Sequence, residues 1–217
     1  VPGVEAVFTH EDAPALRFSS AQHELHTDDP ADTRVLDDVV RFKGQRVAVV
    51  AAASVAAAEA GVRALRIDYE ILPAVFEPDE ALAPGAPLLH AAAAAEPGVG
   101  TPAPSNIVAE LHAELGNPEA GFAAAVAVHE GTYYSQRLQH VALETHAAIA
   151  SFDEHGRLVV RTSTQVPFLV RRTLCRVFDL PLEKVRVVSG RVGGGFGGKQ
   201  EVLVEDVAVL AALRLGR

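Results

Sequence analysis

The segment Gly193–Lys199, with the sequence GGGFGGK, carries the residue types and the spacing most suited to chemistry. Glycine tolerates positive φ and lets the backbone approach a ligand closely, and successive free N–H groups can form an anion-binding concavity. Five glycines surround one phenylalanine, Phe196. A lone aromatic residue between two predicted rigid elements argues against a merely flexible connection. We therefore interpret this segment as a ligand-binding loop.

Two nucleotide-binding motifs fit the loop in part. Gly193, Gly198 and Lys199 satisfy the P-loop pattern G-x-x-x-x-G-K. Gln200, however, stands where that motif has the Ser or Thr hydroxyl that ligates magnesium. With Gly195 the same glycines also satisfy G-x-G-x-x-G, but the sequence ends before the acidic ribose-binding residue of that motif would be reached. A nucleotide-binding protein with a degenerate P-loop stays open as an alternative.

His140, Glu144 and His146 form a second group of residues able to do chemistry. In a helix, His140 and Glu144 would share one face, but no third metal ligand follows at a useful spacing. We expect a packed, hydrogen-bonded cluster that supports the glycine loop rather than a zinc site.

Composition excludes several classes of function. The 217 residues are 49% hydrophobic and 22% charged, which is ordinary for a globular protein. The formal net charge of −9 argues against a nucleic-acid surface. No apolar run is long enough to span a membrane, and we expect a cytoplasmic protein. Cys175 is the only cysteine, so the chain alone cannot hold a disulfide or an iron–sulfur cluster.

Alternating hydrophobicity predicts mixed strands and helices in residues 1–83. Val4–Phe8 and Val47–Ala51 are predicted strands, the second of them buried on both faces. Ser54 is the predicted N-cap of a helix over Val55–Leu65. Arg66–Ile71 alternates like a further strand. Residues 84–118, rich in Ala, Pro and Gly, are predicted to be a linker, with a short helix or spacer at the alanine run 91–95.

Residues 119–217 are predicted to form a second unit. The predicted elements, in chain order, are a strand over 125–134, a turn at 153–156, a strand over 157–165, a helix over 168–178, a strand over 184–192 and a helix over 202–215. Arg171, Arg172 and Arg176 are expected to line a solvated helix face. The glycine loop thus connects a strand to a helix.

Three ordered phrases resemble the molybdenum hydroxylases of the xanthine dehydrogenase/aldehyde oxidase family. They are QHVALETH at 139–146, STQ at 163–165 and VGGGFGGK at 192–199. VPGV, KGQRVAVVAA and YEILPAV resemble the α/β hammerhead domain of the same large subunits. The resemblance implies an α+β (mixed α/β) protein with a hammerhead domain at 1–83, a linker at 84–118 and the N-terminal part of a molybdenum-cofactor-binding domain at 119–217. We expect that domain to be truncated at its C-terminus.

The resemblance also implies roles for particular residues. Phe196 would lie beside the molybdenum and position a flat substrate. The backbone of Gly194, Gly195 and Gly197 would lie against the cofactor, and the Gln165 amide would donate to an oxygen ligand of the metal. Gln165 and Phe196 would thus contact the metal's ligands rather than the metal itself.

Gln200 departs from the xanthine-specific members of this family. They carry a glutamate at this place, directly after the loop lysine, which hydrogen-bonds the purine. Gln200 would contact substrate here without a negative charge, and using Glu201 instead would require a rotation around a helix. Purines, other N-heterocycles and aldehydes therefore remain open as substrates.

The implied reaction is oxidative hydroxylation of such a substrate with water as the oxygen source. The cofactor would be molybdenum-molybdopterin, with the cytosine dinucleotide form as one option. Partner subunits or domains would hold [2Fe–2S] clusters and FAD in an oligomer of heteromers. The general-base glutamate would lie beyond Arg217, so no catalytic residue is assigned within the chain, and we expect the isolated chain to be inactive. A non-catalytic assembly module is the remaining alternative.

Overall fold

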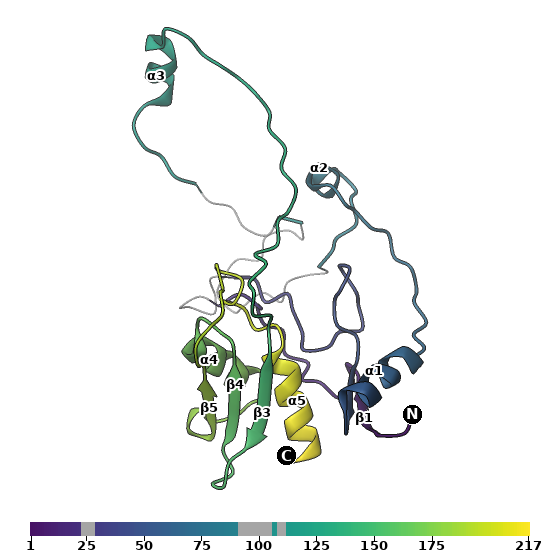
Figure 1. The fold of residues 1–217 in the computed structure, drawn as a ribbon. Helices are drawn as coiled ribbons and strands as arrows, with labels where there is room; N and C mark the ends of the chain where they lie inside the picture. Colours follow the sequence, from purple (N-terminus) through teal and green to yellow (C-terminus); the bar gives the residue numbers. More distant parts are fainter. Residues whose placement is uncertain (23–28, 91–105, 108–111) are drawn as a thin grey trace.

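Figure 1 shows the computed structural model, which describes residues 1–22, 29–90, 106–107 and 112–217. Two small sheets and several helices give the mixed helix-and-sheet fold expected from the sequence. A two-stranded sheet belongs to the N-terminal half, and a three-stranded sheet belongs to the C-terminal half.

The N-terminal half contains a two-stranded antiparallel sheet with a helix packed against it. Strand β1 (Val4–Phe8) pairs antiparallel with β2 (Val49–Ala52), and helix α1 (Val55–Ala64) follows directly. Ser54 caps α1, because its hydroxyl accepts a hydrogen bond from the backbone of the first turn. A Cβ at Gly61 would lie 2.8 Å from a valine side chain of β2, so glycine lets the helix pack close to the sheet. These predicted elements are confirmed.

The C-terminal half contains the sheet that leads to the glycine loop. Its strand order is β3 (Ala148–Phe152), β4 (Leu158–Thr162) and β5 (Val185–Val188). β3 and β4 are antiparallel, whereas β4 and β5 are parallel and are joined by α4 (Pro167–Val177) and a 3₁₀ turn. The chain leaves β5, passes through the glycine loop and enters α5 (Glu205–Leu215).

One hydrophobic core joins the two halves. The helices α4 and α5 bury their apolar sides against the same face of the β3–β4–β5 sheet, and Phe8, Phe18, Val35 and Leu36 of the N-terminal half belong to the same buried cluster. Because both halves bury their apolar surface in one continuous cluster, each half stabilises the other.

Several sequence predictions were wrong in detail. Residues 66–71 and 125–134 alternate in hydrophobicity, yet neither segment is a strand in the structure. Ile71 and Tyr134 are 93% and 94% exposed, and within the described residues these segments have no strand beside them. Alternation favours a strand only where a pairing partner is present. The third strand of the large sheet, β3, was not predicted, and α5 begins at Glu205 rather than at Val202.

Two short helices were also not predicted. They are α2 (Pro78–Leu82) and α3 (Pro118–Ala124), and each begins with a proline at its first position. Figure 1 shows α3 on a long excursion of the chain away from the large sheet. The alanine run predicted as a short helix lies outside the described residues. None of the helices in the described ranges is long and apolar enough to cross a membrane.

The arginines of α4 do not form the solvated face expected of them. Arg171, Arg172 and Arg176 are all partly buried. The Arg171 guanidinium donates to the carbonyl of Val185 at 2.8 Å and to the carbonyl of Leu182, so it attaches α4 to the start of β5.

Candidate functional site

The glycine loop is folded into two consecutive tight turns. The Gly198 N–H donates to the Gly195 carbonyl at 2.8 Å, and the Gln200 N–H donates to the Gly197 carbonyl at 3.1 Å. Phe196 and Gly197, in the centre of the first turn, have φ of 52° and 85°. Positive φ at both central positions is the pattern of a type I′ turn and is strained for a phenylalanine. The strained residue is 73% exposed, so its ring is presented rather than packed.

Gln165, three residues after the end of β4, lies directly against this loop. Its N–H donates to the Lys199 carbonyl at 3.0 Å, and its side-chain Oε1 accepts from the Lys199 N–H at 3.3 Å. A Cβ at Gly195 would lie 2.6 Å from Gln165 Cδ, so any larger residue there would displace the Gln165 side chain. The Gln165 Nε2 donates no hydrogen bond to the part of the chain that the structure describes. This amide therefore keeps a donor for a ligand.

Glu144 and Lys199 form an ion pair behind the loop. The Lys199 Nζ lies 2.8 Å from Glu144 Oε2, and the lysine side chain is only 1% exposed. The Gly193 N–H donates to the same carboxylate oxygen at 2.7 Å. The hydrogen bond from Lys199 lowers the pKa of Glu144, and the one from Gly193 lowers it further. Glu144 is thus held as a carboxylate at the base of the loop.

The two histidines predicted to support the loop both contact Gly198. The His146 Nε2 donates to the Gly198 carbonyl at 2.8 Å. A Cβ on Gly198 would lie 2.7 Å from His140 Nδ1, so the imidazole packs against the glycine. The predicted hydrogen-bonded cluster is confirmed for Glu144 and His146, whereas His140 is exposed and meets the loop only by packing against Gly198, and residues 140–146 are not helical. Among the described residues, no three His, Cys, Asp or Glu side chains are arranged to hold a metal ion.

The N-terminal half contacts the chain directly after the loop, and no sequence motif predicts this contact. The Gln22 N–H donates to the Gln200 carbonyl at 3.0 Å, and the Val202 N–H donates to the Ser20 carbonyl at 2.8 Å. The Ser20 hydroxyl donates to the Glu201 carboxylate at 3.1 Å. These groups are far apart in sequence, so only the fold brings them together.

These contacts distinguish the two side chains after the loop, Gln200 and Glu201, that could meet a ligand. Gln200 is exposed, whereas the Glu201 carboxylate is bonded to Ser20. Residues 200–204 are not helical, so the expected rotation around a helix does not apply. Gln200 is therefore the more exposed of the two side chains, and the partly buried Glu201 is already bonded.

The loop has the donors that an oxygen-rich ligand requires. In the described part of the chain, the backbone N–H groups of Gly194, Gly195, Phe196 and Gly197 donate no hydrogen bond. Four successive unpaired donors, with the Gln165 amide beside them, suit phosphate, pterin or metal-bound oxygen atoms. The cofactor implied by the sequence therefore fits these residues. A P-loop does not, because the amine of Lys199 is buried on Glu144 instead of being available to a phosphate.

Comparison with known proteins agrees with this geometry. A family model described as the molybdopterin cofactor-binding domain matches residues 100–217, and one described as the aldehyde oxidase and xanthine dehydrogenase a/b hammerhead domain matches residues 1–73. The chain belongs to the xanthine dehydrogenase/aldehyde oxidase family of molybdopterin-dependent oxidoreductases. Its fold is that of a hammerhead domain followed by the start of a molybdenum-binding domain.

Individual family members are similar over the whole chain. A probable hypoxanthine oxidase, XdhD, of Escherichia coli O157:H7 is 35% identical across all of this chain and 25% of its own length. The xanthine dehydrogenase molybdenum-binding subunit of the same organism is 34% identical across all of this chain and 28% of its own length. The aldehyde oxidoreductase of Desulfovibrio gigas superposes with a TM-score of 0.81 at 26% identity, covering 100% of this chain and 23% of its own. The chain thus spans about a quarter of these relatives.

Proposed function

We propose that this chain forms one wall of the cofactor site of a molybdenum hydroxylase, which hydroxylates an N-heterocycle or an aldehyde with water as the oxygen source. The observation that carries the proposal is the row of four unpaired N–H donors over 194–197. The names of three relatives, which refer to hypoxanthine, xanthine and an aldehyde, support the substrate classes.

The chain's own residues would bind and orient the cofactor. The backbone of Gly194, Gly195 and Gly197 would lie against its oxygen atoms, since a Cβ at these places would hold the backbone away. The Gln165 Nε2 would donate to an oxygen ligand of the metal, and Phe196 would contact those ligands as well. When bound, the molybdenum cofactor supplies two-electron oxidation coupled to transfer of a water-derived oxygen.

Two exposed side chains would meet the substrate. The Phe196 ring offers a flat apolar surface for stacking against a heterocycle or a planar carbonyl group. Gln200 offers one amide donor and one acceptor in place of a charge. Because Glu201 is bonded to Ser20, no carboxylate replaces the missing one. We infer that the side chain at position 200 contacts the substrate through an uncharged amide.

The remaining parts of the enzyme would come from elsewhere. Cys175 is buried and is the only cysteine, so electrons would leave through [2Fe–2S] clusters and FAD on partner subunits or domains. The general-base glutamate and a second cofactor-binding domain would also lie outside these residues. The long exposed segment that includes Val126, Tyr134 and Leu143 supports this, since such side chains usually pack against further protein. The cytosine dinucleotide form of the pterin, a cytoplasmic location and an oligomer of heteromers belong to the same proposal.

The test is metal analysis of the native complex, captured through a tag on the full-length version of this chain. About one molybdenum and about four iron atoms per protomer are expected, the iron count being that of two [2Fe–2S] clusters. A complex with its partners bound but with neither metal would overturn the proposal. Binding of ATP or GTP by such a preparation would instead support the P-loop alternative.

A further inference from the structure

One carboxylate oxygen joins the two ends of the glycine loop. Glu144 Oε2 accepts the Gly193 N–H at 2.7 Å at the start of the loop and the Lys199 ammonium at 2.8 Å at its end. We propose that Glu144 is a positioning residue, which holds the loop closed and thereby sets the place of Phe196 and of the unpaired N–H groups. The effect on the cofactor rests on the proposed function, whereas the effect on the loop does not.

The charge of Glu144 is required because Lys199 is buried. Glu144 is the only hydrogen-bond acceptor of the Lys199 ammonium in the described part of the chain. A buried ammonium without a counter-charge is strongly destabilising. Loss of the carboxylate would therefore force the lysine to move toward water, and the end of the loop would move with it.

The backbone fixes the carboxylate relative to the loop. The Glu144 N–H donates to the Gly193 carbonyl at 3.1 Å, so these two residues exchange main-chain and side-chain hydrogen bonds. A Cβ at Gly193 would lie 2.6 Å from the Glu144 Cβ, so only glycine permits this approach. From this position a single carboxylate oxygen reaches both donors.

The contacts at the two ends of the loop maintain the strained backbone of Phe196 at its centre. Both the N–H and the carbonyl of Lys199 are bonded to Gln165, and its ammonium is bonded to Glu144. With this residue and Gly193 fixed, the chain between them must complete a tight turn, which places Phe196 at φ 52°. The ion pair thus sets the position of Phe196, which would face the cofactor, without itself contacting the cofactor.

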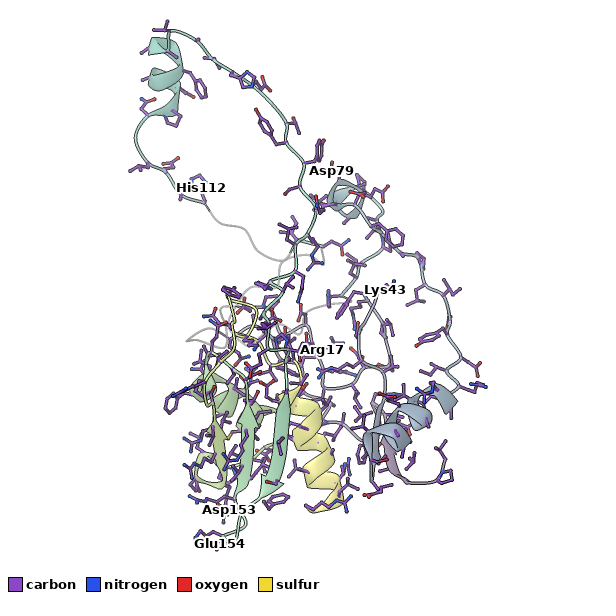
Figure 2. The ribbon with its side chains drawn as sticks, in the orientation of Figure 1. Arg17, Lys43, Asp79, His112, Asp153 and Glu154 are labelled. Atoms are coloured by element: carbon purple, nitrogen blue, oxygen red, sulfur yellow. The ribbon has the colours of Figure 1, made fainter. Side chains whose placement is uncertain are left out.

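The experiment compares variants in the full-length protein within its native complex. Glu144→Gln keeps the shape and removes the charge, Lys199→Met removes the buried ammonium, and the double variant removes both. Glu154→Gln is the matched control, because Glu154 is exposed in the β3–β4 turn, at the end of the sheet away from the loop (Figure 2). Hydrogen exchange of residues 190–200 and molybdenum content are measured, with exchange of β4 as the internal control for folding.

Glu144→Gln is expected to raise loop exchange by at least about tenfold, as loss of a charged hydrogen bond allows, and to lower molybdenum content. Exchange of β4 and of the Glu154→Gln control stays at the parental level. The double variant exchanges more slowly in the loop than Glu144→Gln, because no unpaired charge is left behind. That partial rescue distinguishes a charge-dependent closure from simple loss of packing.

Parental loop exchange in Glu144→Gln would overturn the inference. If turnover were lost in that variant while loop exchange and molybdenum content stayed parental, Glu144 would instead act on the substrate itself. If the parental complex contains no molybdenum and the loop still opens in Glu144→Gln, the proposed function fails while the positioning role of Glu144 stands.

Discussion

The guanidinium of Arg46 donates two hydrogen bonds to the two carboxylate oxygens of Asp206, at 2.6 and 2.7 Å. Arg46 precedes β2 in the N-terminal half, and Asp206 lies in the first turn of α5 with its side chain fully buried. Burial raises the pKa of Asp206, and the hydrogen bonds from Arg46 oppose that rise. This pair fixes the helix that follows the glycine loop against the other half of the molecule.

Replacing Arg46 should therefore be strongly destabilising. Arg46→Met leaves the Asp206 carboxylate buried without its counter-charge, and we expect a loss of about 3–5 kcal/mol in the free energy of unfolding. Urea denaturation measures it. Arg63→Met is the matched control, since Arg63 forms an exposed pair with Glu59 on α1 and should change stability by less than about 0.5 kcal/mol. Equal losses in the two variants would contradict the role of the buried pair.

The loss in Arg46→Met should also depend on pH. Because the pKa of Asp206 is raised in the folded state, the folded protein binds more protons than the unfolded one between the two pKa values, and its stability falls as the pH rises through that range. Without Arg46 the pKa rises further. The difference in unfolding free energy between parent and variant should be small in acid and should grow toward neutral pH. A difference that does not vary with pH would show that Asp206 does not titrate in this way.

The pKa of Glu144 is shifted in the opposite direction to that of Asp206, so its effect on stability has the opposite dependence on pH. Its pKa is lowered by Lys199 and then by the Gly193 N–H, so its stabilising contribution is present above the ordinary glutamate pKa of about 4.3 and is lost as the pH falls through the lower folded-state pKa. Carboxyl carbon NMR should find a titration midpoint below that of an ordinary glutamate. Lys199→Met should move that midpoint up toward the ordinary value. An unchanged midpoint in the variant would mean that the ion pair is not formed in solution.

Gly195→Ala should disturb the loop where Gly190→Ala does not. The new Cβ would lie 2.6 Å from Gln165 Cδ, whereas a Cβ at Gly190 meets nothing within 4 Å. We expect Gly195→Ala to lose about 1–3 kcal/mol of stability by overpacking, measured by urea denaturation, and to lower the molybdenum content of the full-length protein. Similar losses in both variants would indicate that the glycines matter only for chain flexibility.

Gln200→Glu tests the substrate class. Restoring a carboxylate after the loop lysine should increase kcat/KM for hypoxanthine relative to a simple aldehyde by about tenfold or more, the size of effect given by one charged hydrogen bond. Steady-state kinetics of the full-length complex measures the ratio. Glu201→Gln, which removes a carboxylate already bonded to Ser20, should leave the ratio unchanged. A change confined to Glu201→Gln would reverse the assignment of these two positions.

Local patterns in the sequence predicted the elements whose partners are close along the chain. Ser54 capping α1, the turn at Asp153 and the helical spacing of α4 all depend on neighbours within a few residues. The same patterns failed for residues 66–71 and 125–134, because a strand also needs a partner and none lies beside them in the described structure. Strand β3 was not predicted although its partner β4 follows after a short turn, because its sequence AIASF is short and does not alternate between apolar and polar residues.

The supporting residues of the loop could be predicted only in part. His140, Glu144 and His146 were expected to form a supporting cluster because they lie at close spacing with no third metal ligand beside them. Neither the pairing of Glu144 with Lys199 nor the contact of Ser20 with Glu201 has a local signal, because each joins residues that only the folded chain brings together. The alternation that marks a strand says nothing about such side-chain pairs.

The bridge between Ala21 and Glu201 has a consequence for synthesis on the ribosome. The Ser20 hydroxyl and the Glu201 carboxylate are separated by 181 positions, and contacts of such long range form slowly because a large loop must be closed first. A chain made from its N-terminus exposes Ser20 long before its partner emerges. The N-terminal half therefore keeps this edge uncovered while the 181 positions up to Glu201 are synthesised, and the contact between Ser20 and the end of the glycine loop can form only after Glu201 has left the ribosome.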